Sequence, residues 1–145
     1  MFSPDFKEFI ELLNKNEALY LVVGGYAVGV HGHPRYTGDL DIWLLPEKEN
    51  AKKILTAINE FGFGSLGISE DDLTKEGIVI QLGYPPLRID LLTAIDGVSF
   101  QECYPGRKTV SIEGLQVSFI GYYDLIKNKK ASGRHQDLGD IENLQ

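Results

Sequence analysis

Apolar residues in the first sixty positions alternate between helical spacing and short continuous runs. Residues 3–13 place apolar side chains three or four positions apart after a serine and a proline, which predicts an amphipathic helix. Residues 19–23 form a continuous, partly β-branched apolar run, typical of a buried strand that ends at the next glycine. A short helix over 26–31 and an amphipathic helix over 46–62 are predicted on either side of a second apolar run.

The second half of the chain alternates instead with the period of a strand. Two alternating segments, 78–82 and 87–91, are separated by a turn rich in glycine and proline and predict an antiparallel pair. Glu113-Gly114 predicts a second hairpin further on. Two helices are expected over 122–131 and 134–144 with a break at Gly133, and loops over 63–76, with one helical turn, and 93–107.

The composition predicts one globular domain over residues 1–145, with 43% hydrophobic and 24% charged residues. The net charge of −7 disfavours binding of extended DNA or RNA, which generally needs a basic face, although a local basic cluster could hold one nucleotide. No apolar run approaches the ~20 residues that span a bilayer, and no signal peptide is evident. Cys103 is the only cysteine, so no internal disulfide can form, and a reducing cytoplasm is the expected setting.

Two acidic residues interrupt the second apolar run. Asp39 and Asp41 are two positions apart, so on a strand their side chains leave the same face. Like charges held close together are relieved by a shared proton or a bound cation, and Mg²⁺ is the natural candidate because it prefers oxygen ligands. The alternative is a solvated strand end, or partners for Arg35 and nearby lysines.

Two glycines follow the first apolar run. Gly24 and Gly25 lack side chains, so a phosphate could approach the backbone amides at the start of the next helix. A tight turn between a strand and a helix requires the same backbone conformation, so the glycines alone do not distinguish a phosphate site from a simple turn. Two glycines followed at this distance by a carboxylate pair form a more specific pattern than either feature alone.

This pattern carries a resemblance to a known superfamily. The stretch GGYAVGVHGHPRYTGDLDIWL, with Gly24, Gly25, Arg35, Thr37, Asp39 and Asp41, resembles the nucleotidyltransferase fold superfamily, in its small bacterial branch related to abortive-infection and toxin nucleotidyltransferases. A weaker likeness extends to Arg88-Ile89-Asp90 and to the tail KKASGRHQDLGDIENL. The resemblance implies a single-domain α/β (α+β) fold with a mixed, mostly antiparallel sheet flanked by helices. It also implies a third carboxylate on a neighbouring strand, which Asp90 matches; the alternative is the polar member of an alternating edge strand.

Basic residues near the acidic pair have two interpretations each. Arg35 would either neutralise the carboxylates or reach a nucleotide phosphate, and Thr37 would accept or donate a hydrogen bond in the same turn. Lys130 and Arg134 would either contact a triphosphate or only complement a helix dipole.

For other polar and aromatic residues, a structural role is the first expectation. Asp137 and Asp140 share one side of the last helix and are expected to cap it or to form salt bridges. Tyr26, Tyr36 and Trp43 lie near the presumed cleft, where stacking on a base is the alternative to ordinary core packing.

The predicted activity, implied by the resemblance, is the magnesium-dependent transfer of a nucleoside monophosphate from a nucleoside triphosphate such as ATP to a hydroxyl of an unidentified acceptor. Asp39, Asp41 and Asp90 would hold Mg²⁺, and Gly24 and Gly25 would cradle the phosphates. The acceptor is open between RNA such as tRNA, a protein and a small molecule. The rival functions are an inactive nucleotide-binding regulatory module and a metal-dependent phosphohydrolase. A toxin role with an antitoxin partner follows only from analogy.

Overall fold

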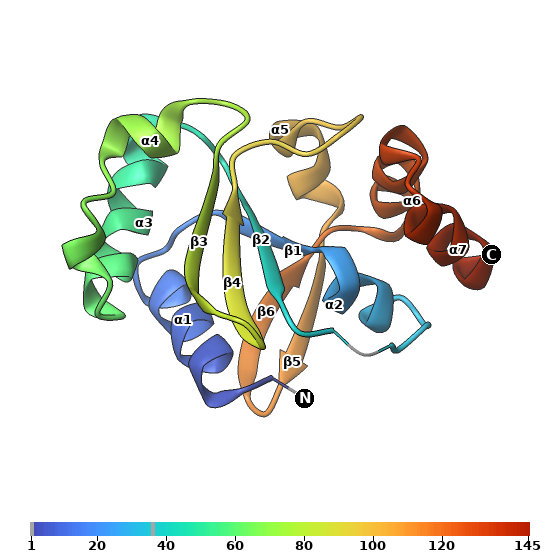
Figure 1. The fold of residues 1–145 in the computed structure, drawn as a ribbon, viewed down its shortest axis with the longest axis horizontal. Coiled ribbons are helices and arrows are strands. Elements are labelled where there is room, and N and C mark those ends of the chain that lie inside the picture. Colours follow the sequence, from blue (N-terminus) through green and yellow to red (C-terminus); the bar gives the residue numbers. More distant parts are fainter. Residues whose placement is uncertain (1, 36) are drawn as a thin grey trace.

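A six-stranded mixed sheet runs through the part of the chain that the computed structural model describes, residues 2–35 and 37–145 (Figure 1). Its strands are β1 (Tyr20–Val23), β2 (Leu40–Leu44), β3 (Val79–Tyr84), β4 (Leu87–Leu92), β5 (Lys108–Ile112) and β6 (Leu115–Phe119). They lie in the order β3-β4-β2-β1-β6-β5. The pairs β1-β2, β3-β4 and β5-β6 are antiparallel, whereas β2-β4 and β1-β6 are parallel. The expected mixed, mostly antiparallel sheet is confirmed.

Helices cover the sheet from two sides. They are α1 (Pro4–Lys15), α2 (Gly24–Val30), α3 (Lys48–Glu60), α4 (Glu70–Thr74), α5 (Phe100–Cys103), α6 (Tyr122–Ser132) and α7 (His135–Leu144). In Figure 1, α1, α3 and α4 gather to the left of the strands, and α2, α6 and α7 gather to the right. Within the described ranges, no helix has both the length and the apolar character that crossing a membrane requires.

The central strands form the middle of the hydrophobic core. All four residues of β1 are buried, as are four of the five residues of β2. Helix α1 buries Phe6, Phe9, Ile10 and Leu13 because these residues share one helical face. Asp41 is the one residue of β2 that stays partly exposed, so the central strand opens to solvent at an acidic position.

Glycine-containing turns were predicted correctly. Glu113 and Gly114 have φ values of 53° and 83°, as a two-residue hairpin turn between β5 and β6 requires. Gly133 ends α6 with a φ of 64°, a left-handed conformation that glycine adopts without strain.

Two boundaries differ from the sequence-based expectation. Helix α3 begins at Lys48 and not at Pro46, because Glu47 provides the extended N-cap residue. The segment 93–107, expected to be irregular, contains α5 and a 3₁₀ turn over Tyr104–Gly106. The short helix forms because Phe100 packs edge-on against the Trp43 ring at 5.2 Å, a contact between residues far apart in sequence.

Candidate active site

Two carboxylates from separate segments lie side by side on the sheet. In the parallel pairing of β2 with β4, Asp41 is directly in register with Asp90. Partners on neighbouring strands are only about 5 Å apart, and these two side chains leave the same face. Asp39 immediately precedes β2, and one arginine, Arg88, contacts both Asp39 and Asp90. The tertiary structure therefore brings Asp39, Asp41 and Asp90 together, as the sequence predicted.

Arg88 is paired with two of these three carboxylates. Its Nε donates to Asp90 Oδ1 at 2.6 Å, and its Nη2 donates to Asp90 Oδ2 at 3.0 Å. The same Nη2 donates to Asp39 Oδ2 at 3.0 Å. Hydrogen bonds to both Asp90 oxygens make this a bidentate pair, the strongest form of arginine–carboxylate contact. From the sequence, Arg88 was named only as part of the weaker likeness at Arg88-Ile89-Asp90 and was assigned no role in the site.

Asp41 has a different electrostatic setting. It forms no ion pair with any residue in the described ranges. Burial raises the pKa of Asp41 to about 6, and the nearby charges of Asp90 and then Asp39 add to the increase. A half-buried carboxylate without an ion-pair partner among the described residues, next to two other acids, is a position that a cation would stabilise.

The two glycines keep the space in front of the acids open. Gly24 has a φ of 70°, and a Cβ atom added there would collide with the carboxylate of Asp41. A Cβ atom on Gly25 would collide with the side chain of Thr37. Backbone at the start of α2 therefore packs directly against the acidic strand, which larger residues would prevent.

Three cations form a cationic wall beside the acids: Arg35 from the segment before β2, Lys129 on α6 and Arg134 just before α7. Lys129 is only 4% exposed, and its Nζ lies 3.1 Å from Asp137 Oδ1 and 3.0 Å from Asp140 Oδ2. Arg35 donates from Nε and Nη2 to the two oxygens of Asp140, each at 3.2 Å. Arg134 Nε donates to Asp137 Oδ2 at 2.7 Å. The expectation of salt bridges for Asp137 and Asp140 is confirmed, and these two acids hold three cations in place.

This network also explains the charge state of Asp137. Burial by itself would raise the pKa of Asp137, but hydrogen bonds from Arg134 and Lys129 outweigh burial and hold it below the ordinary value. Asp137 is therefore charged although it is buried.

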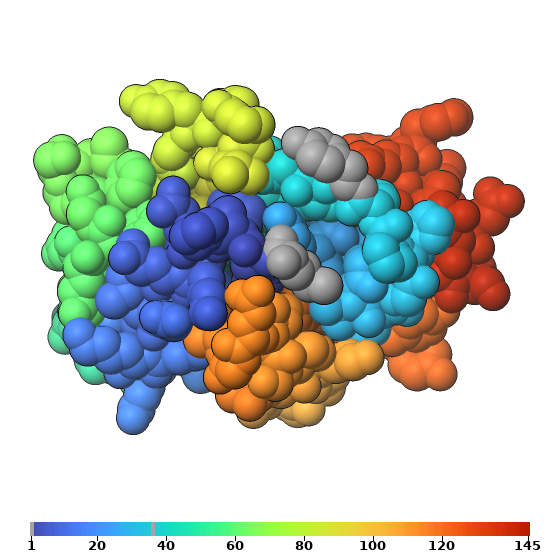
Figure 2. All heavy atoms as spheres, turned by 90° about the horizontal axis from the view of Figure 1, so that it is seen from below, coloured from blue at the N-terminus to red at the C-terminus, as the bar shows by residue number. Residues whose placement is uncertain are grey.

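Arg35 was predicted to neutralise the acidic pair or to bind a phosphate. In the structure it pairs with Asp140 and not with Asp39 or Asp41, so the first interpretation was wrong about the partner. The segment that carries Arg35 lies against the C-terminal helices in the space-filling view, where cyan and red atoms meet (Figure 2). Thr37 donates a hydrogen bond to the Arg35 carbonyl at 3.3 Å, within the same turn as expected.

Two cavities meet at the acids. The smaller, of about 250 Å³, is lined by Gly24, Gly25, Arg35, Thr37, Gly38, Asp39, Asp41, Lys129, Arg134 and Gln136. The larger, of about 390 Å³, is lined by Val23, Gly24, Asp41, Val79, Leu92, Ala94, Ile95, Asp96, Asn128, Lys129, Ser132 and Arg134. Both include Gly24, Asp41, Lys129 and Arg134, so these residues form the boundary between a strongly charged space and a more apolar one.

Some predicted residues lie outside these cavities. Lys130 is exposed and lines neither of them; its neighbour Lys129 takes the inward position, four residues after the buried Leu125 and on the same helical face. Asp90 lines neither cavity because Arg88 covers it. The spacing of Leu125 and Lys129 is the signal that could have identified the buried lysine.

The aromatic residues do not form a stacking platform in the described part of the site. Trp43 is 1% exposed and belongs to the core. Tyr26 packs edge-on against Phe2 and Phe6, and its hydroxyl donates to the Thr37 carbonyl at 3.4 Å. Tyr36 lies outside the described residues.

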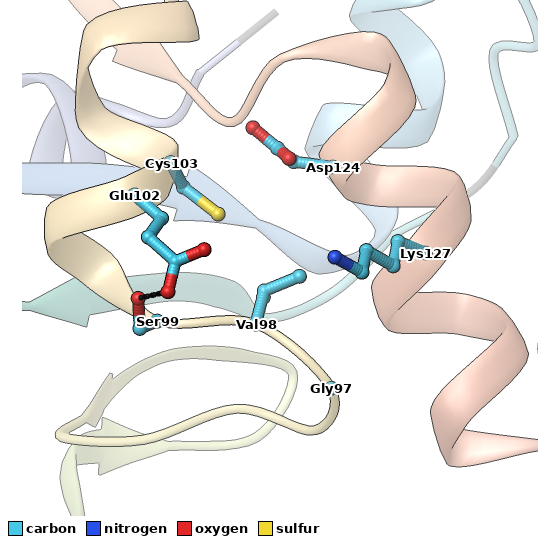
Figure 3. Close-up of a pocket in the computed structure, with 7 residues that line it drawn as sticks. All are labelled: Gly97, Val98, Ser99, Glu102, Cys103, Asp124 and Lys127. Carbon is cyan, nitrogen blue, oxygen red and sulfur yellow. Dashed lines mark hydrogen bonds between the residues drawn. The ribbon is translucent and has the colours of Figure 1, made fainter.

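A further cavity, of about 350 Å³, lies elsewhere on the molecule. It is lined by Gly97, Val98, Ser99, Glu102, Cys103, Asp124 and Lys127, and Figure 3 shows the Cys103 thiol directed into it. None of these residues lines the two cavities at the acids. Burial, followed by the charge of Asp124, raises the pKa of the thiol to about 12, so Cys103 is not an activated nucleophile.

The donor set fits a hard divalent cation, but it is not assembled as a ready metal site. In residues 2–35 and 37–145, no three His, Cys, Asp or Glu side chains form a group that could hold a metal ion. Asp39, Asp41 and Asp90 supply only oxygen donors, which suits Mg²⁺, and the partner-free Asp41 is open to a cation. Asp39 and Asp90 are both paired with Arg88 in this structure.

Two solved structures share this fold over nearly the whole chain. A protein from Thermotoga maritima, provisionally assigned as a nucleotidyltransferase, superposes with a TM-score of 0.61 at 15% identity and covers 99% of this chain and 90% of its own. An antigenic nucleotidyltransferase-like protein from Paracoccidioides brasiliensis superposes with a TM-score of 0.57 at 19% identity and covers 99% of this chain and 77% of its own. At these identities the similarity shows the fold.

Sequence comparison identifies the family. None of the curated proteins compared with this chain matches it. The model of a family described as nucleotidyltransferases of unknown function, DUF6036, matches residues 5–145, which is nearly the entire sequence. With the fold and the clustered acids in place, we conclude that this chain belongs to the DUF6036 family of nucleotidyltransferases.

Proposed function

We propose that the protein transfers a nucleoside monophosphate from a nucleoside triphosphate to a hydroxyl group of an acceptor, with Mg²⁺ as its cofactor. The observation that carries the proposal is the register of Asp41 with Asp90, together with the cavity that Asp39 and Asp41 line with three cationic residues. In the reaction, the acceptor oxygen forms a bond to the α-phosphorus, the bond from that phosphorus to the bridging oxygen breaks, and pyrophosphate leaves.

The smaller cavity suits the triphosphate. Arg35, Lys129 and Arg134 line it together with the two glycines, so cationic groups and unobstructed backbone face the same space. Phosphoryl transfer requires mainly positioning and charge stabilisation, which this arrangement supplies. Asp137 and Asp140 orient these cations and themselves stay out of the cavity lining.

Asp39, Asp41 and Asp90 would hold the metal ion. When bound, Mg²⁺ neutralises charge on the transferred phosphoryl group and on the leaving oxygen. Asp90 would also accept the proton of the acceptor hydroxyl, because it lies beside Asp41 on the neighbouring strand. Gly24 and Gly25 would allow the phosphates to approach the backbone amides closely.

The assignment can be tested by labelling. The protein is incubated with Mg²⁺ and each of four α-labelled triphosphates, with RNA, cell extract or no addition, in parallel with Asp41→Asn. We expect label to pass to an acceptor only with the unmodified protein and to depend on Mg²⁺. Equal labelling by both proteins would exclude the proposed role of Asp41.

A second candidate function is a nucleotide-binding module without transfer. The observation that favours it is the pairing of Arg88 with Asp39 and Asp90, which leaves one carboxylate free. This candidate predicts Mg²⁺-dependent nucleotide binding with no labelled product in any acceptor screen. A metal-dependent phosphohydrolase would instead release phosphate or pyrophosphate without an acceptor.

A role as the toxin of a toxin–antitoxin pair is a narrower proposal that rests on the resemblance of the glycine and acid pattern. If it holds, expression of the protein arrests growth, and Asp39→Ala restores it at equal protein level. Growth arrest by both versions would separate toxicity from the acidic site.

A further inference from the structure

The Arg88 guanidinium occupies the place between two acids that a cation would share. It binds both oxygens of Asp90, at 2.6 and 3.0 Å, and one oxygen of Asp39 at 3.0 Å. The Asp90 side chain is 12% exposed and that of Asp39 is 38% exposed, so the bridge spans the inner and outer parts of the site. Asp41, which is in register with Asp90, has no such partner among the described residues.

We propose that Arg88 is an internal counter-cation that competes with the divalent metal ion for Asp39 and Asp90. The inference rests on the proposed function, since it assumes that a metal ion binds to these acids. At rest, Asp41 is the one of the three acids that has no arginine contact among the described residues. Both oxygens of Asp90 and Oδ2 of Asp39 become fully available only when the guanidinium turns away.

Competition follows from the chemistry of the contacts. A metal ion needs oxygen lone pairs of the carboxylates, and in Asp90 both oxygens already accept hydrogen bonds from Arg88. A second positive charge at contact distance also repels the incoming ion. Arg88 and the ion therefore cannot both use Asp90 fully.

The position of Arg88 allows it to leave. Its side chain is 23% exposed, and it sits one residue after the start of β4, beside the exposed hairpin residues Tyr84 and Leu87. Within residues 2–35 and 37–145, the guanidinium forms hydrogen bonds and ion pairs with these two acids alone. A rotation of one side chain toward solvent would free both acids without moving the strands.

A purely positioning role makes the opposite prediction. If Arg88 only holds the acids in place for the metal, its removal lets them move apart and weakens metal binding. If it competes, its removal strengthens metal binding. The direction of the change in affinity distinguishes the two roles.

The test measures Mn²⁺ binding, with the ion alone as the probe, by electron paramagnetic resonance of free Mn²⁺ and by calorimetry. We expect Arg88→Met to bind Mn²⁺ at least about tenfold more tightly than the unmodified protein, and Arg88→Lys to lie in between, because a lysine keeps the charge but loses the bidentate geometry. Arg107→Met, at an exposed arginine stacked on Tyr104, is the control and should leave the affinity unchanged.

Folding is followed in the same samples. Without metal, Arg88→Met should melt at a lower temperature than the unmodified protein, because two acids lose their partner. On addition of Mn²⁺, its melting temperature should rise more than that of the unmodified protein. A folded Arg88→Met with equal or weaker Mn²⁺ affinity would overturn the inference but leave the proposed function standing. Absence of binding in every version would overturn the inference and the metal-dependent function together. Tight binding that survives Asp41→Asn in the Arg88→Met background would place the ion elsewhere and also overturn the inference.

Discussion

Asp41 combines a functional position with a cost in stability. Its pKa is about 6 in the folded protein, against an ordinary value of 3.8, so the folded state holds this proton more tightly than the unfolded state does. The resulting stabilisation is complete below about pH 4 and is lost as the pH rises through about 6. Near neutrality, the ionised carboxylate therefore weakens the fold that presents it.

The substitution Asp41→Asn should remove this cost. An asparagine cannot ionise, so we expect the free energy of unfolding at pH 8 to rise by about 3 kcal/mol, with a difference near zero at pH 4. Urea denaturation at both pH values measures this. Asp71→Asn, at an exposed acid in α4, is the control and should change stability similarly at both pH values. A variant that is less stable than the unmodified protein at pH 8 would contradict the account of Asp41.

At Gly24, the backbone conformation and the neighbouring atoms leave no room for a side chain. Gly24→Ala adds a Cβ atom that collides with the Asp41 carboxylate, at a left-handed φ of 70°. We expect a loss of about 1–3 kcal/mol in stability and a loss of Mn²⁺ and nucleotide binding. Urea denaturation and calorimetry measure the two effects.

The chain offers a matched control for this change. Gly67 has a φ of 71° and no atom within 4 Å of an added Cβ. Gly67→Ala therefore imposes the same backbone strain without the collision, and should lose stability of the order of 1 kcal/mol while ligand binding remains. Equal ligand binding by both variants would argue against a role for the open space at Gly24.

At the scale of elements, the pair of helices α6 and α7 depends on buried charge. Lys129 on α6 is paired with Asp137 and Asp140 on α7, and all three residues are at most 4% exposed. Breaking a buried ion pair by removing one partner is costly because the other charge stays buried. Arg134 and Arg35 also pair with these acids, so part of the charge would remain compensated.

We therefore expect Lys129→Met to lower the free energy of unfolding by about 2–4 kcal/mol and to weaken triphosphate binding. Lys130→Met, at the exposed neighbour, should stay within about 0.5 kcal/mol and bind triphosphate normally. Urea denaturation and calorimetry with each variant separate these outcomes. Similar losses in both would show that the helix needs lysine charge in general and not the buried contact.

At the scale of the whole molecule, the site joins elements from both ends of the chain. The cavities at the acids use β1, α2, β2 and the α6–α7 pair, so a ligand bound there stabilises the folded state as a unit. A triphosphate with Mg²⁺ at about 100 times its dissociation constant should add about 2.7 kcal/mol to the free energy of unfolding. For a domain of this size, that corresponds to a rise of several degrees in melting temperature.

Thermal unfolding with each triphosphate measures this stabilisation. Chelation of the divalent ion should remove most of the shift, and Gly24→Ala should show little of it. A shift that persists with chelator present would point to a nucleotide held by the cationic wall alone. The protein as a whole has a net charge of −7, which repels a triphosphate. The local cations of the cationic wall are therefore needed to attract it.

Local patterns were sufficient to predict most elements of the fold. The apolar run before Gly24, the alternating segments of β3 and β4 and the break at Gly133 are encoded by neighbouring residues, so their structures could be inferred directly. The acid pair and its place at an apolar strand were inferred in the same way, whereas the central position of that strand is seen only in the sheet order. Asp90 required the resemblance as well, because nothing local shows which strands become neighbours.

The sequence by itself therefore determined most elements, the glycine bend and the acid pair Asp39 and Asp41, because these depend on side chains close together in the chain. Only the tertiary structure decided which cations face them. Lys129 is buried and paired, and Lys130 is not, because α6 packs against α7 on the face that carries Lys129. Arg88 reaches both Asp39 and Asp90 because β2 and β4 are parallel neighbours. Charge pairing acts through space over a few ångströms, between residues up to 105 positions apart here, so only the folded chain could decide it.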